Sequence, residues 1–401
     1  MFNKNNKIKL PIIFPENDNY YSKEKSYILH ILEPEPEGEL GGADTHVLNL
    51  CKEQKKNSKY VPIVLINQNK SYTNMLKEAK IAYIDGTILK HKKLDLIRYA
   101  KNIPEKLHIS CIHSHQYDAN YITYLLHKIY KKTWGKIPVL MTCHGWIENT
   151  VKNIIKTKLD FFTYNISKAL ITVCKKDYVR LKKHVKNKGI YCIPNGVCSR
   201  TSILLSNQDI KNMFNLPLNA KIITFVGRLS QEKRIDLYLK ACKEVSKKYD
   251  NVIFVVAGSG SEERRLKELA SALKIKNQTY FLGFVKQIEC IYEITDIMVL
   301  ASDTETTPRT ILEAMSFNKC VVATCVGGVP DIIESGKNGI LVNKGSYIDI
   351  SKAIIQLLKN TELRMKIGEK AKNTVNEKFT ISIMERNIEK TYDSIINNLY
   401  V

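Results

Sequence analysis

The chain has 401 residues, of which 44% are hydrophobic and 25% charged, an ordinary globular composition with enough length for two domains and sizeable cores. No apolar run approaches the ~20 residues that a membrane span needs, and the first residues lack the apolar block of a secretory signal, so we expect a cytoplasmic protein. The net charge of +22 comes without a recognisable nucleic-acid module, which argues against nucleic acid as a partner.

The positive charge is concentrated in the first half of the chain. Residues 1–200 carry 34 Lys and Arg against 17 Asp and Glu (34 − 17 = +17), and residues 201–401 carry 28 against 23 (28 − 23 = +5). Residues 128–136 and 180–188 mix cations with aromatic or aliphatic residues, as surfaces near anionic lipid headgroups do. The alternative is that this charge forms solvated helix faces. The ten cysteines form no Cys-x-x-Cys pair and are expected to be reduced core residues.

The order of apolar runs predicts an α/β fold with two doubly wound parallel sheets. Residues 1–26 show no clear period and are predicted to be an extended tail. From residue 27 onward, short apolar runs alternate with amphipathic stretches of helical length, which indicates parallel strands with helical crossovers. The predicted strands are 27–32, 61–66, 81–84, 108–113, 138–143, 168–173 and 190–193, then 221–226, 252–257, 278–282, 296–301, 319–323 and 339–342. A polar stretch after residue 197 is the best linker, so we expect domains at 27–200 and 201–378.

Two glycine-containing turns and a set of histidines follow predicted strands. Gly41 and Gly42 open a helix whose backbone N–H groups could face an anion, although they could also be plain tight-turn glycines. The glycines of residues 257–260 also follow a predicted strand, and there a tight strand-to-helix turn is favoured over an anion-binding role. The histidines of residues 113–115 close a strand, but neither a cysteine nor a carboxylate stands at useful spacing, so we expect no metal. His144, beside a glycine at a strand end, is a candidate hydrogen-bonding group facing a cleft, or else a histidine satisfied within the core.

Two cations follow the strand at 221–226. Gly227 ends the strand, Arg228 comes next, and Lys233 stands five residues further on. An Arg offers fixed bidentate geometry and a Lys a mobile point charge, so together they suit a diphosphate and could neutralise charge on a departing phosphate. The alternative is a solvated loop in a lysine-rich chain.

Two glutamates stand eight positions apart after the strand at 296–301. Glu305 lies on the turn that leaves the strand, and Glu313 lies on a helix in which Pro308 suits the first position. Both carboxylates could therefore reach a ligand over the carboxyl end of the strand, where open α/β sheets bind ligands.

Together these segments resemble the GT-B glycosyltransferases, specifically glycosyltransferase family 4 (glycosyl transferases group 1), from about residue 27 to the end. The motifs that carry the resemblance are Gly41-Gly42, Thr142-x-His144-Gly145, residues 193–197, Gly227-Arg228 with Lys233, Gly258-x-Gly260, residues 281–284, the Glu305 and Glu313 pair, residues 312–315 and residues 322–330. The resemblance implies two facing Rossmann-like domains, an acceptor site in the first, a nucleotide-sugar site in the second, and a last helix, within 379–401, that returns to the first domain.

The resemblance also implies roles for individual residues. Arg228 and Lys233 would hold the donor diphosphate, Glu313 the ribose hydroxyls and Glu305 the hydroxyls of the transferred sugar, while His144 would contact that sugar at the reacting centre. The implied donor-binding set is Gly41, Gly42, Arg228, Lys233, Phe284, Glu305, Thr306, Thr307, Pro308, Arg309 and Glu313, and the implied catalytic set is His144, Arg228, Lys233 and Glu305. Many members have glycine where this chain has Thr306, which leaves the sugar's identity open.

The reaction implied by the resemblance is transfer with retention of anomeric configuration, by front-face attack and without a metal or another cofactor. The expected donor is a nucleotide diphosphate sugar, with a UDP-linked hexose or N-acetylhexosamine first. The expected acceptor is a lipid-linked or surface saccharide, which would place the basic first domain at the inner face of an anionic membrane. A small soluble acceptor, such as an aminocyclitol, is the alternative. An enzyme that rearranges or phosphorolyses sugars, and a catalytically idle subunit of the same fold, are the rivals.

Overall fold

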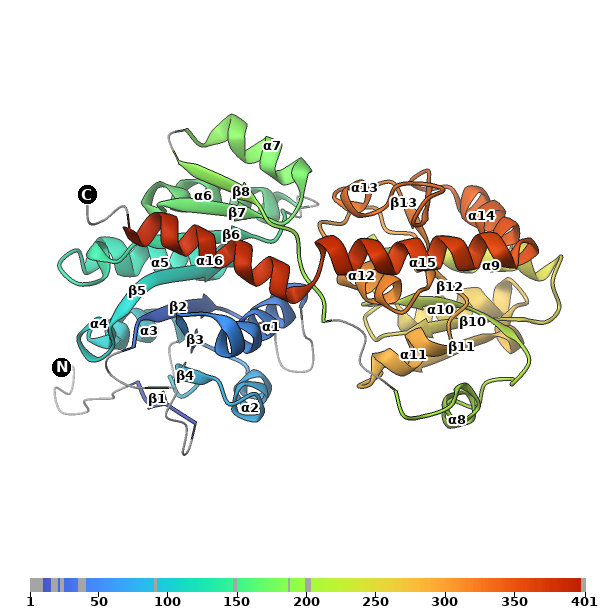
Figure 1. Cartoon of the computed structure of the whole chain (residues 1–401), viewed down its shortest axis with the longest axis horizontal. Coiled ribbons are helices and arrows are strands. Elements are labelled where there is room, and N and C mark those ends of the chain that lie inside the picture. Colours follow the sequence, from blue (N-terminus) through green and yellow to red (C-terminus); the bar gives the residue numbers. More distant parts are fainter. Residues whose placement is uncertain are drawn as a thin grey trace. The chain divides into compact units, whose positions relative to one another are not determined.

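The computed structural model of the chain describes residues 10–15, 21, 25–34, 41–89, 92–146, 150–186, 188–198 and 203–397 (Figure 1). The chain forms two compact units. The first consists of Met1–Pro194 and Ile381–Val401, and the second of Asn195–Thr380. The sequence placed this division after residue 200, and the start of the returning segment at residue 379.

The first unit contains an eight-stranded sheet in the order β1-β4-β3-β2-β5-β6-β7-β8. Its strands are β1 (Ile12–Ile13), β2 (Tyr27–Leu32), β3 (Val61–Ile66), β4 (Ala82–Asp85), β5 (Ile109–His115), β6 (Val139–Cys143), β7 (Ala169–Thr172) and β8 (Gly189–Cys192). The pairs from β4 to β8 are parallel, while β1 pairs antiparallel with β4. The strand β1 lies within the stretch that the sequence predicted to be an extended tail, and two apolar residues are too few to show a period.

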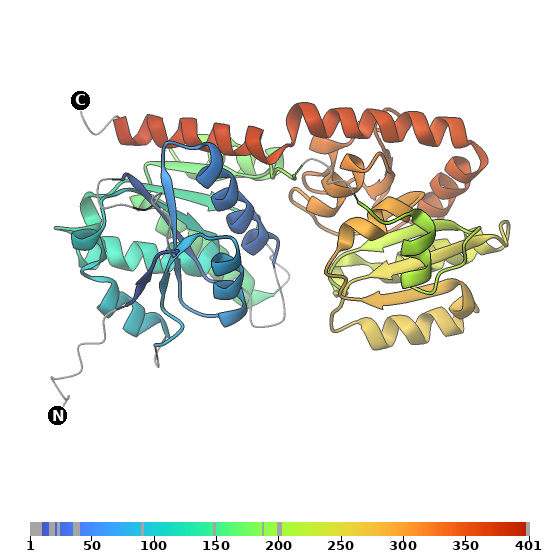
Figure 2. The same ribbon diagram turned by 60° about the horizontal axis from the view of Figure 1, so that its bottom comes forward.

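Helices cover both faces of this sheet. They are α1 (Gly42–Asn57), α2 (Lys70–Glu78), α3 (Lys92–Ala100), α4 (Ile103–Lys106), α5 (Gln116–Ile129), α6 (Val151–Thr163), α7 (Lys175–His184) and α16 (Ile381–Asn397). Along β2, Leu29 and Ile31 pack in one cluster with residues of α3 and α5, and Ile28 packs on the opposite face with α1 and α16. Successive side chains of a strand point to opposite faces, which explains this alternation. The last helix of the chain therefore belongs to the first unit, as expected (Figures 1 and 2).

The second unit contains a six-stranded parallel sheet in the order β11-β10-β9-β12-β13-β14. Its strands are β9 (Lys221–Val226), β10 (Val252–Ala257), β11 (Thr279–Gly283), β12 (Ile297–Leu300), β13 (Cys320–Thr324) and β14 (Ile340–Val342). Its helices are α8 (Asn207–Met213), α9 (Ile235–Ser246), α10 (Glu263–Ala272), α11 (Ile288–Ile294), α12 (Arg309–Ser316), α13 (Val329–Ile332), α14 (Tyr347–Lys359) and α15 (Thr361–Lys378). The strand order reverses between β9 and β12, which makes the carboxyl ends of these two strands the expected binding crevice of a doubly wound sheet.

The cores follow from the strand sequences. The central strands β9, β10, β12 and β13 are almost entirely buried, as expected for parallel strands covered on both faces. The strands predicted at residues 27–32, 61–66, 221–226 and 252–257 have the observed bounds. None of the helices in the described residues is long and apolar enough to cross a membrane.

Candidate functional site

The loops that leave β9 and β12 meet at the point where the strand order of the second sheet reverses. After β9 the chain passes Arg228, which is exposed, and forms a short 3-10 helix, Gln231–Lys233. After β12 it turns at Ser302 and reaches Glu305. Lys233 Nζ lies 2.7 Å from Glu305 Oε1, and the two side chains are 24% and 7% exposed. The structure therefore joins two residues of the predicted site that are far apart in the sequence.

The carboxylate of Glu305 is held by a second neighbour. The hydroxyl of Ser302 donates to Glu305 Oε1 at 2.7 Å, the same oxygen that Lys233 contacts. The backbone N–H of Gly328 donates to the carbonyl oxygen of Glu305 at 3.2 Å. Both the side chain and the backbone of Glu305 are thus fixed in place. Ser302 was missed from the sequence, because a serine at a strand end has no distinguishing pattern.

The turn at Gly327 supports the backbone of Glu305. Gly327 has a φ of +56°, and a Cβ added there would lie 1.6 Å from the carbonyl oxygen of Glu305. We predict that Gly327→Ala lowers the free energy of unfolding by about 3 kcal/mol, because it adds left-handed strain to a backbone clash. It should also weaken ligand binding, because the clash displaces Glu305. Urea unfolding measures the first effect.

Gly345→Ala is the matched control for that substitution. Gly345 has a φ of +79°, with nothing within 4 Å of an added Cβ, so only the left-handed strain of about 1 kcal/mol should remain. Equal losses of stability in the two variants would show that the close approach to Glu305 has no effect.

Glu313 lies near the middle of α12 and is bound by two partners. The hydroxyl of Tyr292 donates to Glu313 Oε2 at 2.9 Å, and Arg309 Nη2 lies 3.0 Å from Oε1. The helix begins at Arg309, so Pro308 is its N-cap and not its first residue as predicted, because its ψ of 113° is extended. Thr307 is buried, and its carbonyl oxygen accepts from Asn195 Nδ2 at 3.0 Å. The segment between the two glutamates is therefore anchored at both ends.

A charged clamp that the sequence did not reveal ties the same two loops together. Arg234 adopts a left-handed φ of 51° and contacts Asp236 at 3.0 Å and Asp303 at 3.3 Å. Its hydrogen bond to Asp236 raises the pKa of the guanidinium further above its usual value. The backbone N–H of Asp303 donates to the carbonyl oxygen of Glu232 at 2.8 Å. These contacts hold the loop that carries Lys233 against the loop that carries Glu305.

Two other predicted features of the second unit are the glycine turn after β10 and the aromatic residue after β11. Gly258 has a φ of +142°, and a Cβ there would lie 1.9 Å from the carbonyl oxygen of Gly227, so this glycine is required by the packing of the loop after β9. This agrees with the structural interpretation of residues 257–260. Phe284 is 71% exposed and follows β11, the edge strand two places from β9. The role of Phe284 in donor binding therefore stays a prediction.

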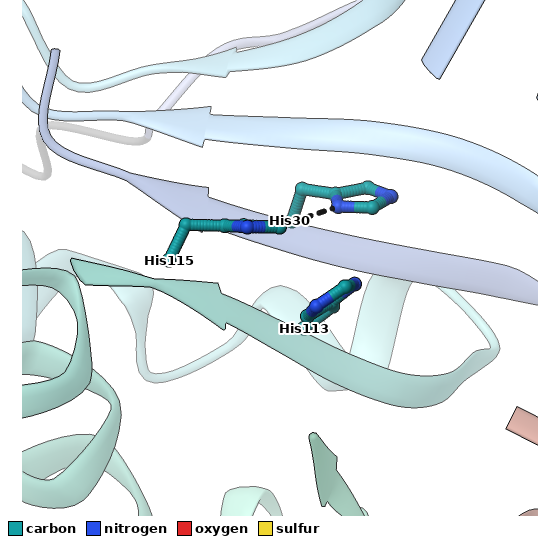
Figure 3. A group of neighbouring side chains, drawn as sticks. All are labelled: His30, His113 and His115. Carbon is teal, nitrogen blue, oxygen red and sulfur yellow. Dashed lines mark hydrogen bonds between the residues drawn. The ribbon is translucent and has the colours of Figure 1, made fainter. Parts of the chain in front are cut away.

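In the first unit, histidines gather where β2 and β5 adjoin. His30 lies on β2, and His113 and His115 lie on β5, all three fully buried (Figure 3). Residues 111, 113 and 115 alternate with Ile112, and Cys111 packs in the cluster that contains α16, so the histidines face α1 and α16. Strand pairing brings His30 beside His113, a neighbour that the sequence argument on cysteines and carboxylates did not consider.

These histidines form a hydrogen-bonded chain. Gln54 Nε2 donates to the Tyr392 hydroxyl at 3.2 Å, and Gln54 Oε1 lies 2.9 Å from His30 Nε2. With the amide placed in this way, His30 carries its proton on Nε2 and accepts at Nδ1 from His115 Nε2, 3.1 Å away. His115 Nδ1 then accepts from His144 Nε2 at 3.4 Å. His144 is therefore linked to residues of α1 and α16 through two buried imidazoles.

Two triads of histidines have nitrogens close enough for a metal ion, namely His30 with His113 and His115, and His46 with His115 and His144. In the first triad, His113 is already bonded to the Tyr392 hydroxyl at 2.6 Å and to Thr142 at 2.7 Å. In the second, His115 shares its nitrogens with His30 and His144. A cation in either triad would have to replace these hydrogen bonds.

Burial makes the histidine cluster sensitive to acid. Desolvation lowers the pKa of His30 from 6.5 to about 4. It also lowers the pKa of His113 and that of His115 well below 6.5. A lowered pKa in the folded state means that the unfolded chain binds more protons, so stability is full above pH 6.5 and falls as the pH drops toward 4. We predict a loss of about 3 kcal/mol from His30 alone over that range.

Urea unfolding at pH 7.5, 6 and 5 measures the part of this loss that falls above pH 5. His30→Gln should reduce the slope of stability against pH, because it removes the buried imidazole whose pKa is lowered. A wild-type stability that stays constant from pH 7.5 to 5 would contradict the account of the buried cluster.

The glycine turn that opens α1 lies beside this cluster. Gly41 is the N-cap of α1, and its backbone N–H donates to the carboxylate of Asp44 at 2.8 Å. His46, on the first turns of α1, lies with its ring centroid 4.7 Å from that of His144. The structure thus brings His144 to the N-terminal end of α1, but one of the expected anion-binding N–H groups is occupied by Asp44.

Comparisons with known proteins agree with this architecture. Residues 40–199 match the family model described as Glycosyltransferase Family 4, and residues 206–374 match the one described as Glycosyl transferases group 1. One uncharacterized glycosyltransferase of Methanocaldococcus jannaschii is 26% identical over 89% of this chain and 95% of its own length. A second from that organism is 30% identical over 63% of this chain and 67% of its own length. The crystal structure of Anabaena HepE in complex with UDP and glucose has a TM-score of 0.79 at 18% identity, covering 92% of this chain and 100% of HepE.

Two Rossmann-like units with a returning C-terminal helix define a GT-B glycosyltransferase fold. The chain belongs to the family 4 glycosyltransferases, the glycosyl transferases group 1. Both predictions are confirmed.

Proposed function

We propose that the protein is a retaining glycosyltransferase that moves a hexosyl or N-acetylhexosaminyl group from a nucleotide diphosphate sugar to a hydroxyl of a saccharide acceptor. The observation that carries this proposal is the pairing of Lys233 with Glu305, beside Glu313, at the carboxyl ends of β9 and β12. A UDP-sugar is the first candidate donor, because HepE, which has the same fold, holds UDP and glucose.

In the proposed reaction the bond between the anomeric carbon and the phosphate oxygen breaks while the acceptor oxygen bonds to that carbon on the same face. The acceptor proton passes to the departing phosphate oxygen. Arg228 and Lys233 neutralise the charge that develops on the diphosphate, a task that preorganised cations perform without a metal. Glu313 binds the ribose hydroxyls, and His144 remains the first unit's candidate for contact with the sugar.

The ion pair between Lys233 and Glu305 suggests how the donor is accepted. A diphosphate would draw Lys233 Nζ away from Glu305 Oε1, and the released carboxylate oxygen could then accept from a sugar hydroxyl. Ser302, 2.7 Å from the same oxygen, would keep the carboxylate in place during this exchange. The pair thus keeps two charged groups satisfied until both components of the donor arrive.

The acceptor that we favour is a lipid-linked or surface saccharide, because the first half of the chain carries most of the positive charge and could work at the inner face of the cytoplasmic membrane. A small soluble acceptor is the alternative, and activity independent of vesicles would favour it. A catalytically idle subunit would keep the fold but release no nucleotide diphosphate.

A thermal-shift screen tests the donor. The purified chain is heated with UDP, GDP, ADP and their common sugar conjugates, since a ligand that binds only the native state raises the unfolding midpoint. We expect stabilisation by UDP and its sugars, followed by release of UDP when an acceptor is added. No stabilisation by any nucleotide would contradict the proposal.

A further inference from the structure

On α6 most apolar side chains face solvent, Phe161 being the exception that packs against the core. Val151, Ile155 and Phe162 are 75%, 60% and 55% exposed, and Ile154 and Leu159 are each 41% exposed. At 3.6 residues per turn, Val151, Ile155 and Phe162 fall within about 40° of one another around the helix axis. We call these five residues the α6 face. A surface helix normally buries such a stripe against its own core.

The opposite side of α6 is fixed to the first unit by polar contacts. Asp160 is buried and accepts from Asn120 Nδ2 at 2.7 Å and from Trp146 Nε1 at 3.1 Å. Thr157 and Thr163 are buried on the same side. Rotating the helix to cover the α6 face would bring Asp160 into solvent and break these hydrogen bonds, so the outward apolar face is part of the folded structure.

Cations lie within and beside the α6 face, and one of them, Lys156, is paired with Asp118 of α5 at 3.5 Å. Lys158 lies exposed within the stripe, and α6 has no carboxylate except the buried Asp160. The ring of Phe162 lies 5.3 Å from that of Tyr124 on α5, and Lys128 Nζ lies 5.7 Å from the centre of the Tyr124 ring. Ile129, next along α5, is 56% exposed. An apolar stripe with a basic rim is the pattern of a helix that lies in a lipid–water interface.

We propose that the α6 face docks on an anionic lipid surface. Ile155 and Phe162 enter the headgroup region, and Lys128 and Lys158 contact lipid phosphates. A second copy of the chain would place like charges opposite one another across a shared α6 face, which disfavours self-association. This inference gives a location to the membrane contact of the proposed function and depends on that function only for its purpose, because lipid binding can be measured without turnover.

Sedimentation of the full chain with vesicles tests the inference. We expect the chain to pellet with phosphatidylcholine vesicles that contain phosphatidylglycerol, and much less with phosphatidylcholine alone. The double variant Ile155→Asp with Phe162→Asp should bind the anionic vesicles at least about tenfold more weakly. Met365→Asp is the matched control, because Met365 is 68% exposed on α15 of the second unit and should not affect binding. Circular dichroism and the unfolding midpoint verify that each variant is folded.

Three results would overturn the inference. They are no vesicle binding by the wild type, equal binding by the wild type and the folded double variant, and a wild-type dimer that the double variant converts to a monomer. The third result would assign the α6 face to a second copy. Vesicle binding without any stabilisation by nucleotides would support the lipid-binding role of the α6 face and contradict the proposed function. Stabilisation by nucleotides without vesicle binding would support the proposed function and contradict the lipid-binding role.

Discussion

Replacing Lys233 with alanine is expected to lower the rate of glycosyl transfer about 100- to 1,000-fold, the usual cost of losing one group that stabilises developing charge. Lys233 is largely buried, and its Nζ lies 2.7 Å from Glu305 Oε1. Steady-state release of nucleotide diphosphate at saturating donor measures the effect on kcat. Because the cation acts on the departing diphosphate, kcat should fall more than KM rises.

The free energy of unfolding of the Lys233→Ala variant should decrease only slightly, because the variant loses the ion pair with Glu305. Glu305 loses its cation but keeps the hydroxyl of Ser302. Lys221→Ala is the control, because Lys221 pairs with Asp296 at 3.2 Å and is 51% exposed at the start of β9, at the opposite end of the strand. Near-normal turnover in Lys233→Ala would remove Lys233 from the mechanism.

Replacing Glu313 with glutamine is expected to weaken nucleotide binding about 10- to 100-fold, because hydrogen bonds to a charged acceptor contribute roughly 1.5–3 kcal/mol. Glutamine keeps an oxygen for the Tyr292 hydroxyl, so the packing around α12 should survive. Isothermal titration with the nucleotide found in the screen measures the dissociation constant. The change also removes the negative charge that pairs with Arg309. A contact between Arg309 and a ligand phosphate, where one forms, would then become stronger and partly offset the loss.

Glu334→Gln is the matched control for this substitution. Glu334 is 67% exposed and pairs with Lys337, three residues further along the chain. An unchanged dissociation constant in Glu313→Gln, with the control also unchanged, would show that the ribose is bound elsewhere.

The fold was predictable because its signals are local. Apolar runs of strand length fixed β2, β3, β9 and β10 to the residue, and the alternation with helical stretches indicated parallel sheets. The two residues of β1 were missed, because so short a strand is defined by its partner β4 and not by its own pattern. The helix α6 shows the converse: its amphipathic period is present in the sequence, but the period does not say which side faces the core.

The sequence indicated where the candidate site residues lie along the chain, but it did not indicate which of them contact one another. Strand ends identified Lys233, Glu305 and Glu313, but the ion pair between the first two joins loops 72 positions apart and follows only from the order of the strands. The same limit applies to the histidines. The sequence shows His113 and His115 together, whereas the pairing of β2 with β5 places His30 beside them.

Hydrogen exchange with the stabilising nucleotide sugar is the most direct test of the central claim that the donor binds at the carboxyl ends of β9 and β12. The account predicts slower exchange in residues 227–234 and 303–313 when the ligand is added, and much less protection in the Glu313→Gln variant at the same ligand concentration. Protection that omits both segments in the wild type, while the ligand still raises the unfolding midpoint, would contradict the account.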